Sequence, residues 1–327
     1  MAPGAPAAGL VPGLPVPAPS PGTLARPPVG DLLLMGVALS AVSTSGPLIA
    51  ACAAPSLAIA FWRNGMASAV LLPVALLRDR VALRAATAGP AGRWSALAGV
   101  LLALHFGTWI PSIGLTSVAS ATALVATQPV WAALLARLTG ERLPGAAWGG
   151  IAVAVAGAAL VTGADVTLSP RALAGDLLAV VGGGFAAAYM SAGGVARRSL
   201  TTTAYTSVCY SVCALALLAT CLLARVPVVG FRSRDWVLLV LLTLGPQLLG
   251  HSVFSRVLRT TSPTVVSLSI LFEVPGAALL AFFWLHQRPS LLALPGLALL
   301  VGGVALVVRA SGRTTAGVRA DVVAETD

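Results

Sequence analysis

GDLL at residues 30–33 recurs as GDLL at residues 175–178, and AALLA at residues 132–136 recurs as AALLA at residues 277–281. Both pairs are offset by 145 residues, so a single shift relates the two halves of the chain. Each half holds five apolar segments long enough to cross a bilayer, and an odd number of crossings makes the second half enter from the opposite side. The sequence therefore predicts two inverted five-helix repeats, an arrangement typical of membrane carriers.

Composition argues against a water-soluble globule. Hydrophobic residues make up 57% of the 327 residues, charged residues make up 9%, and the mean hydropathy is +0.94. Such a chain has too little polar surface to cover a soluble fold. We expect an all-α membrane protein, because helices satisfy their backbone hydrogen bonds internally in lipid.

Charge does not indicate nucleic-acid binding. All 20 basic residues are arginines, and they lie at the ends of apolar segments rather than in basic runs with aromatics. With the N-terminus inside, 14 of these 20 arginines are cytoplasmic, so the positive-inside bias places both termini in the cytoplasm. The four cysteines lie in or beside apolar segments without histidine or carboxylate company, which favours small buried side chains over metal ligands. We expect no metal and no cofactor.

The chain divides into two repeats between two tails. Residues 1–29 are predicted to form a disordered cytoplasmic leader and residues 310–327 a disordered cytoplasmic tail. The repeats are residues 30–162 and residues 175–309. The ten predicted transmembrane helices are 32–52, 57–77, 94–110, 116–137, 146–162, 176–195, 203–224, 236–256, 263–285 and 290–308.

Three residue types give local information about these segments. Aspartates lie at segment starts, a proline lies inside one segment, and glycines indicate where helices pack closely. Asp31 and Asp176 precede the first segment of each repeat, where a carboxylate can cap free backbone amides. Pro47 follows four small or polar residues inside the first segment, so its neighbourhood either lines a cavity or packs against protein. Small residues at four-residue spacing, as between Gly145 and Gly149, indicate close helix packing.

Glu273 is the acidic residue predicted to lie deep in a membrane span. It follows Pro263 by ten residues, which at about 1.5 Å per residue places it roughly 15 Å deep, near the bilayer midplane. An ionisable group at this depth is a functional candidate by default. The offset of 145 gives Gln128 the equivalent place in the first repeat. The two side chains either contact substrate or a proton, or hydrogen-bond each other and only hold helices together.

Further polar and aromatic residues are candidates for the same substrate-binding or proton-coupling site. The histidines either act in the site or are satisfied by backbone carbonyls. The aromatic rings either face substrate or lie at interfaces and in the core. The arginine either attracts an anionic substrate or snorkels outward. These candidates are Ser269, on the face of Glu273, the one-turn pairs Gln247 with His251 and His105 with Trp109, and Tyr189 and Arg63.

The sequence contains no HExxH, GxSxG or phosphate-binding glycine loop, so we do not expect an enzyme. Several stretches instead resemble the EamA domains of the drug/metabolite transporter superfamily. They are LHF at 104–106 with Trp109, TSVAS at 116–120, TQP at 127–129, GER at 140–142, LGPQLLGHS at 244–252, and TSPTVV at 261–266 leading to Glu273. The resemblance implies a ten-helix inverted-repeat fold and transport of small metabolites, often outward. Leu285-His286 replaces Gly140-Glu141 in the second repeat, so no symmetric role is expected for Glu141.

These observations predict a secondary active transporter that exports small organic metabolites, such as amino acids, across a bacterial plasma membrane. Proton antiport through Glu273 is part of this hypothesis. The alternatives are an uptake carrier or a uniporter, and a membrane scaffold that transports nothing. The expected partners are a small-molecule metabolite, protons and the lipid bilayer. The oligomeric state is not predicted.

Overall fold

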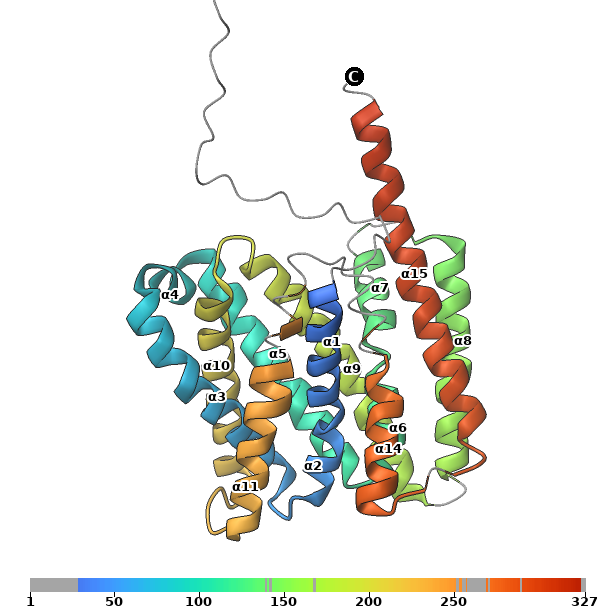
Figure 1. Cartoon of the computed structure of the whole chain (residues 1–327), viewed down its shortest axis with the longest axis horizontal. Helices are drawn as coiled ribbons and strands as arrows, with labels where there is room; N and C mark the ends of the chain where they lie inside the picture. Colours follow the sequence, from blue (N-terminus) through green and yellow to red (C-terminus); the bar gives the residue numbers. More distant parts are fainter. Residues whose placement is uncertain are drawn as a thin grey trace, which may run out of the picture.

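The structure is a computed structural model that describes residues 29–138, 140, 143–166, 169–250, 253–254, 257, 269, 271–288 and 290–324, with the backbone alone at 162–166 and 311–324. Within these ranges every regular element is helical (Figure 1), as predicted. The first half contains α1 (Val29–Ser43), α2 (Ser45–Ala51), α3 (Ser56–Arg78), α4 (Arg80–Thr87), α5 (Gly89–Ile113), α6 (Val118–Val125), α7 (Gln128–Leu138) and α8 (Gly145–Val166). The second half contains α9 (Pro170–Ala196), α10 (Thr202–Leu223), α11 (Ser233–Leu242), the π-helix η1 (Thr243–Gly250), α14 (Glu273–Leu285) and α15 (Leu294–Ala324).

Six segments of the described chain are long and apolar enough to cross a membrane. They are α1 with α2, α3, α5, α6 with α7, α9 and α10. Three shorter apolar helices cover Gly145–Val161, Glu273–Leu285 and Leu294–Ala310. The structure therefore supports a multi-pass membrane protein with six clear spans, fewer than the ten predicted.

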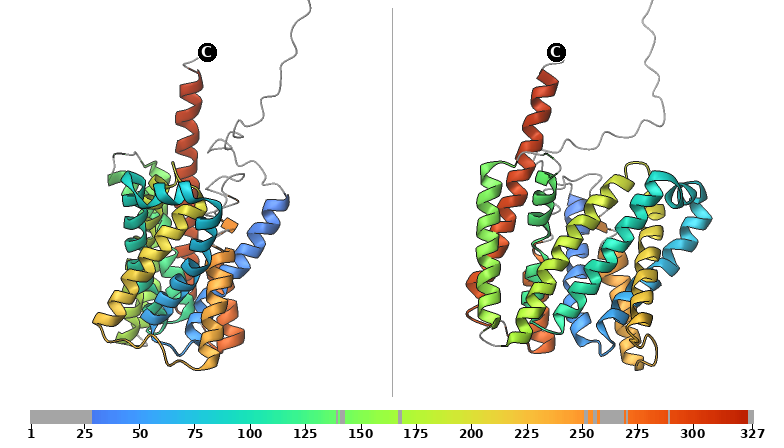
Figure 2. Two further views of the ribbon diagram at one scale, coloured as in Figure 1. Left: turned by 90° about the vertical axis from the view of Figure 1, so that its left-hand side faces the viewer. Right: turned by 180° about the vertical axis from the view of Figure 1, so that it is seen from behind.

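Contacts between the two halves follow a pseudo-twofold pattern. The first helix of the first half, α1, packs on η1 and α14, whereas its counterpart α9 packs on α5, α6 and α7. The pairs α3 with α10 and α8 with α15 each join equivalent helices of the two halves. Figures 1 and 2 show α1 and α9 running in opposite directions through the bundle. This is the arrangement expected of inverted repeats.

Some predicted boundaries differ from the structure. The α9 helix begins at Pro170 and is capped by Ser169, whose hydroxyl accepts a hydrogen bond from the Arg171 N–H at 3.1 Å. Asp176 is therefore buried inside α9 and does not cap it, whereas Asp31 lies in the first turn of α1. The α15 helix continues to Ala324 through residues predicted to form a disordered tail, a segment without proline. The predicted leader, up to residue 28, lies outside the described residues.

Two helices begin at the candidate residues themselves. Gln128 is the first residue of α7 and Glu273 is the first residue of α14. The two residues related by the offset of 145 therefore occupy the same position in equivalent helices. Glu273 lies at the start of α14, and residues 263–268 and 270 of the predicted span before it lie outside the described residues. Pro129 and Pro275 explain the boundary, because a proline in the first helical turn lacks an N–H that would have no intrahelical partner anyway.

Two further segments are irregular, and residues from both line the same cavity as Gln128 and Glu273. The first span is interrupted at Thr44, between α1 and α2, just before Pro47. The eighth span changes from α11 into η1, which contains Pro246. Proline removes a backbone donor, and π-helical turns inside α-helices are frequent at functional sites. Broken helices of this kind form the binding sites of many transporters.

The α8–α15 contact depends on glycine. A Cβ atom at Gly303 would overlap the backbone of Ala154, and one at Gly157 would overlap the backbone of Leu300. The neighbouring Gly302 has nothing within 4 Å of that position. Close packing therefore explains the first two glycines and does not explain Gly302.

We predict that Gly303→Ala lowers the free energy of unfolding by about 1–3 kcal/mol, because the added methyl group must push two helix backbones apart. Gly302→Ala is the matched control, and its effect should stay within about 0.5 kcal/mol. Melting of the purified protein in detergent measures both. Equal melting temperatures for the two variants would contradict this account of the α8–α15 contact.

Candidate functional site

A cavity of about 370 Å³ lies where the irregular segments meet. It is lined by residues from α1, α2, α3, α5, α6, α7, α9, α10, η1 and α14, and α8 and α15 contribute none of its described lining. Seven of the nine candidate residues line it: Arg63, His105, Trp109, Gln128, Tyr189, Gln247 and Glu273. Ser269 is half-buried and is not part of the lining, and His251 lies outside the described residues.

Arg63 is the buried cation of this cavity, and its side chain is 1% exposed. Its Nε donates to Gln247 Oε1 at 2.7 Å and its Nη1 donates to Ser45 Oγ at 3.2 Å. Its Cζ lies 4.4 Å from the centre of the Phe106 ring, a cation–π distance. The alternative that Arg63 snorkels outward is wrong, because partners from α2, α5 and η1 hold the guanidinium inside the bundle.

Glu273 is the acidic side chain of the same cavity. Its carboxyl lines the same cavity and interacts electrostatically with Arg63. Gln128 also lines the cavity, and no hydrogen bond joins its side chain to that of Glu273 in the described structure. The alternative in which these two residues lock the helices together by a direct bond therefore receives no support from their geometry.

His105 and Trp109 form one wall of the cavity. The two rings are stacked, with centroids 5.7 Å apart and planes 9° from parallel. His105 Nδ1 is 2.9 Å from the Gly182 carbonyl oxygen, which can only accept, so Nδ1 is the protonated nitrogen. The expected alternative, in which a backbone carbonyl satisfies the histidine, is thus present for His105. It fixes the ring while the side chain still lines the cavity.

Two buried polar atoms in the cavity wall lack a hydrogen-bond partner among the described residues. They are Trp109 Nε1 and Thr122 Oγ1, on side chains that are 5% and 2% exposed. A buried donor without a partner is costly, so atoms of this kind are candidates for contact with a ligand or water. Thr122 was not a candidate from the sequence, because threonine is common in these segments.

Tyrosines from α9 and α10 also line the cavity. The chain has three tyrosines, and all of them, Tyr189, Tyr205 and Tyr210, line the cavity. Tyr189 interacts with Tyr205, and Tyr210 interacts with Gln247. Only Tyr189 was expected here from the sequence. The concentration of all three tyrosines in the sixth and seventh segments is a signal that would have found the other two.

The two ends of the cavity differ. Toward the α9–α10 connection its lining includes Gly194, which is exposed, and Arg197. At the end that holds α2 and the start of α11, the two halves are joined by hydrogen bonds. They run from the Ala53 N–H to Asp235 Oδ1 (2.9 Å), from Trp62 Nε1 to the Val228 carbonyl (2.7 Å), and from the Val118 N–H to Gln287 Oε1 (3.2 Å).

We find no set of metal ligands among the described residues. Among the described residues, no group of three or more His, Cys, Asp or Glu side chains is placed to hold a metal ion. The four cysteines are buried free thiols.

The family model of the EamA-like transporter family matches residues 28–163 and 173–309, one match on each half of the chain. The chain belongs to the EamA-like transporter family. It is therefore a membrane transporter of that family. Sixteen chains of solved structures match it, among them a crystal structure with 22% sequence identity and a TM-score of 0.59, which covers 85% of this chain and 96% of that one. At this identity the likeness concerns the fold alone. No curated protein matches the chain.

Proposed function

We propose that this EamA-like transporter exports zwitterionic metabolites, amino acids or closely related compounds, through the central cavity. The observation that supports this most strongly is that a buried basic side chain, Arg63, and a partly buried acidic one, Glu273, line the same cavity together with aromatic residues. A guanidinium binds carboxylates in a planar, bidentate manner, and a carboxylate binds an ammonium group. The stacked His105 and Trp109 rings and the tyrosines offer apolar surface for a side chain.

Glu273 is the residue proposed to couple transport to protons. A carboxyl group in the membrane can be neutralised by a proton or by the ammonium group of the substrate, and the two therefore compete. Antiport follows if the site releases substrate when it takes up a proton from the outside. The carrier then uses the inward proton gradient to drive export.

The proposed cycle is alternating access around the cavity, in a ten-helix inverted-repeat fold with both termini in the cytoplasm of a bacterium. In this orientation the α9–α10 connection, where Gly194 is exposed, faces the cytoplasm. The end closed by Asp235, Trp62 and Gln287 then faces outward. Opening to the outside must break these bonds between the halves.

The outer closure can be tested at Cys52, a buried thiol next to Ala53 that also interacts with Asp235. We predict that Asp235→Ala exposes Cys52 to a membrane-impermeant maleimide added outside, in a background where the other three cysteines are alanine. A hydrogen bond to a charged group contributes about 1.5–3 kcal/mol, so labelling should rise about tenfold or more. Asp31→Asn is the control and should label like the parent. Equal labelling of the parent and Asp235→Ala would contradict this closure.

Ligand binding tests the proposed function itself. Purified protein is melted in detergent with each of the twenty amino acids, and at least one should raise the melting temperature, because a ligand that binds the folded state stabilises it. The same amino acid should have no effect on Arg63→Ala. Stabilisation that survives in Arg63→Ala would place the ligand elsewhere. Counterflow in right-side-out vesicles then separates export from uptake.

A further inference from the structure

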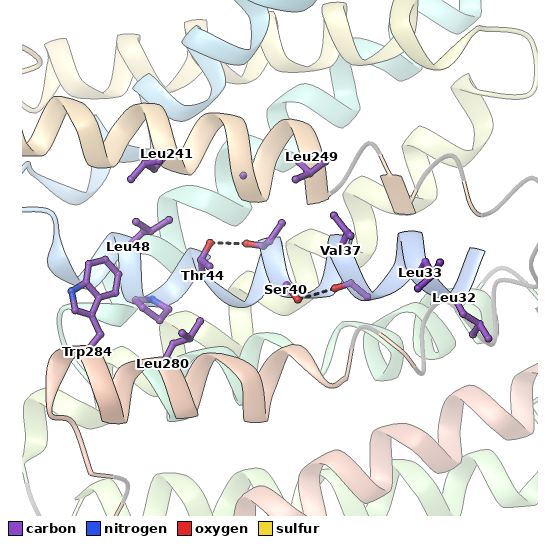
Figure 3. Close-up of a pocket in the computed structure, with 14 residues that line it drawn as sticks. Leu32, Leu33, Val37, Ser40, Thr44, Leu48, Leu241, Leu249, Leu280 and Trp284 are labelled. Carbon is purple, nitrogen blue, oxygen red and sulfur yellow. Dashed lines mark hydrogen bonds between the residues drawn. The ribbon is translucent and has the colours of Figure 1, made fainter. Parts of the chain in front are cut away.

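A second cavity, here called the α1 groove, runs along the outside of α1 and α2 (Figure 3). Its volume is about 860 Å³. One side is formed by α11 and η1 and the other by α14, with Leu241, Leu249, Leu280 and Trp284 directed toward the gap around α1. It is separate from the central cavity, and none of its lining residues lines that cavity.

The chemistry of the α1 groove is apolar. None of its described lining residues is charged. Its two hydroxyl groups are satisfied by their own helix, because Ser40 Oγ donates to the Gly36 carbonyl at 2.9 Å and Thr44 Oγ1 donates to the Ala41 carbonyl at 2.7 Å. An occupant gains nothing there from polar groups, so its contacting part is a hydrocarbon.

The length of the groove along the membrane normal indicates that its occupant is a lipid acyl chain. On α1 and α2 it extends from Leu32 to Leu48, about 24 Å of helix, compared with a hydrocarbon core of about 30 Å. Leu33 is 69% exposed and Trp284 is 45% exposed, so the groove faces the surroundings of the bundle. In a membrane-spanning protein these surroundings are acyl chains, not headgroups, over most of that length.

The α1 groove has open space at two glycines. Gly36 in α1 and Gly245 in η1 have nothing within 4 Å of the position that an added Cβ atom would take. The neighbouring helices therefore leave room for an occupant beside these two residues.

A wall one helix thick separates the α1 groove from the central cavity. Thr44 lines the groove while the next residue, Ser45, lines the cavity and accepts from Arg63. In η1, Gly245 lines the groove while Gln247 lines the cavity and also binds Arg63. Both segments are irregular, so their own helical hydrogen bonding supports them less than in a continuous α-helix.

From these observations we infer that one acyl chain of a membrane phospholipid occupies the α1 groove and supports the cavity wall at Ser45 and Gln247. The chain fills the space that neighbouring helices leave open beside Gly36 and Gly245. It packs against the back of the two segments that hold the Arg63 guanidinium.

Native mass spectrometry tests this inference without any measurement of transport. The protein is purified in detergent, incubated with palmitoyl-oleoyl phosphatidylglycerol and washed. The parent should retain one phospholipid, and Gly36→Leu and Gly245→Leu should each retain at least about fivefold less, because leucine fills the groove. Gly302→Leu is the matched control, since Gly302 is also exposed with open space, and should retain lipid like the parent.

A photoreactive phospholipid with a diazirine in its acyl chain shows where on the protein the acyl chain binds. Adducts should map to residues 32–48, 241–249 and 280–284, and addition of phospholipid should raise the melting temperature of the parent more than that of Gly36→Leu. The inference is overturned if the parent retains no lipid, if Gly302→Leu loses it as readily as Gly36→Leu, or if adducts fall elsewhere. It is equally overturned if the spectra show two protein chains and no lipid, because a second copy would then cover the groove.

Discussion

Arg63→Ala is expected to abolish transport in proteoliposomes while the protein still inserts into the membrane. Arg63 is 1% exposed and donates to Gln247 and Ser45, so alanine removes both the proposed carboxylate-binding group and the link between α3, α2 and η1. Truncating one partner of a buried charged contact costs about 2–5 kcal/mol. In binding this corresponds to a loss of more than about tenfold in affinity.

Two controls separate binding from folding in this experiment. Arg63→Lys keeps the charge but lacks the planar fork, so it should retain part of the stability and little of the transport. Arg84→Ala removes an exposed arginine of α4, outside the cavity, and should transport like the parent. Transport by Arg63→Ala at the parental rate, at equal protein level, would contradict the assignment of Arg63 to the substrate site.

Glu273→Gln should produce the second large effect, which is loss of the pH dependence of transport. Glutamine keeps the shape and hydrogen-bonding capacity at the start of α14 but cannot take up a proton. In the parent, a proton gradient directed into the compartment that holds the substrate should accelerate antiport. In Glu273→Gln the rate should be the same with and without the gradient.

The control for this variant is Asp31→Asn, which neutralises a carboxylate in the first turn of α1, away from the cavity. It should keep the gradient effect. Exchange of labelled for unlabelled substrate without a gradient reports whether Glu273→Gln still binds substrate. An undiminished gradient effect in Glu273→Gln would remove proton coupling through this residue and assign the coupling to a different group.

Much of the fold could be predicted from the sequence because membrane helices carry strong local signals. The offset of 145 residues relates α7 to α14 through the sequence alone, and both helices begin at the related residues Gln128 and Glu273. Boundaries were less predictable. The α9 start at Pro170 and the extension of α15 to Ala324 depend on capping and helix propensity in weakly hydrophobic sequence, where a hydropathy pattern gives little information.

Part of the candidate site could be predicted as well, for a physical reason. Arg63, Gln128, Gln247 and Glu273 are polar residues in apolar segments, where they are costly and therefore conspicuous. Their contacts could not be predicted, since those depend on which faces of distant helices meet. Ser45 is an example, because a serine in a small-residue run carries no signal until α2 is seen against Arg63.

The central cavity is the proposed path of the substrate, and filling it tests that claim directly. Ala126 lines the cavity at the break between α6 and α7, and Ala224 is exposed at the end of α10. Exchange of each of the twenty labelled amino acids is measured in proteoliposomes for the parent, Ala126→Phe and Ala224→Phe. We predict that the parent and Ala224→Phe exchange at least one amino acid and that Ala126→Phe exchanges none. Exchange by Ala126→Phe at the parental rate, or no exchange of any amino acid by the parent, would contradict this path.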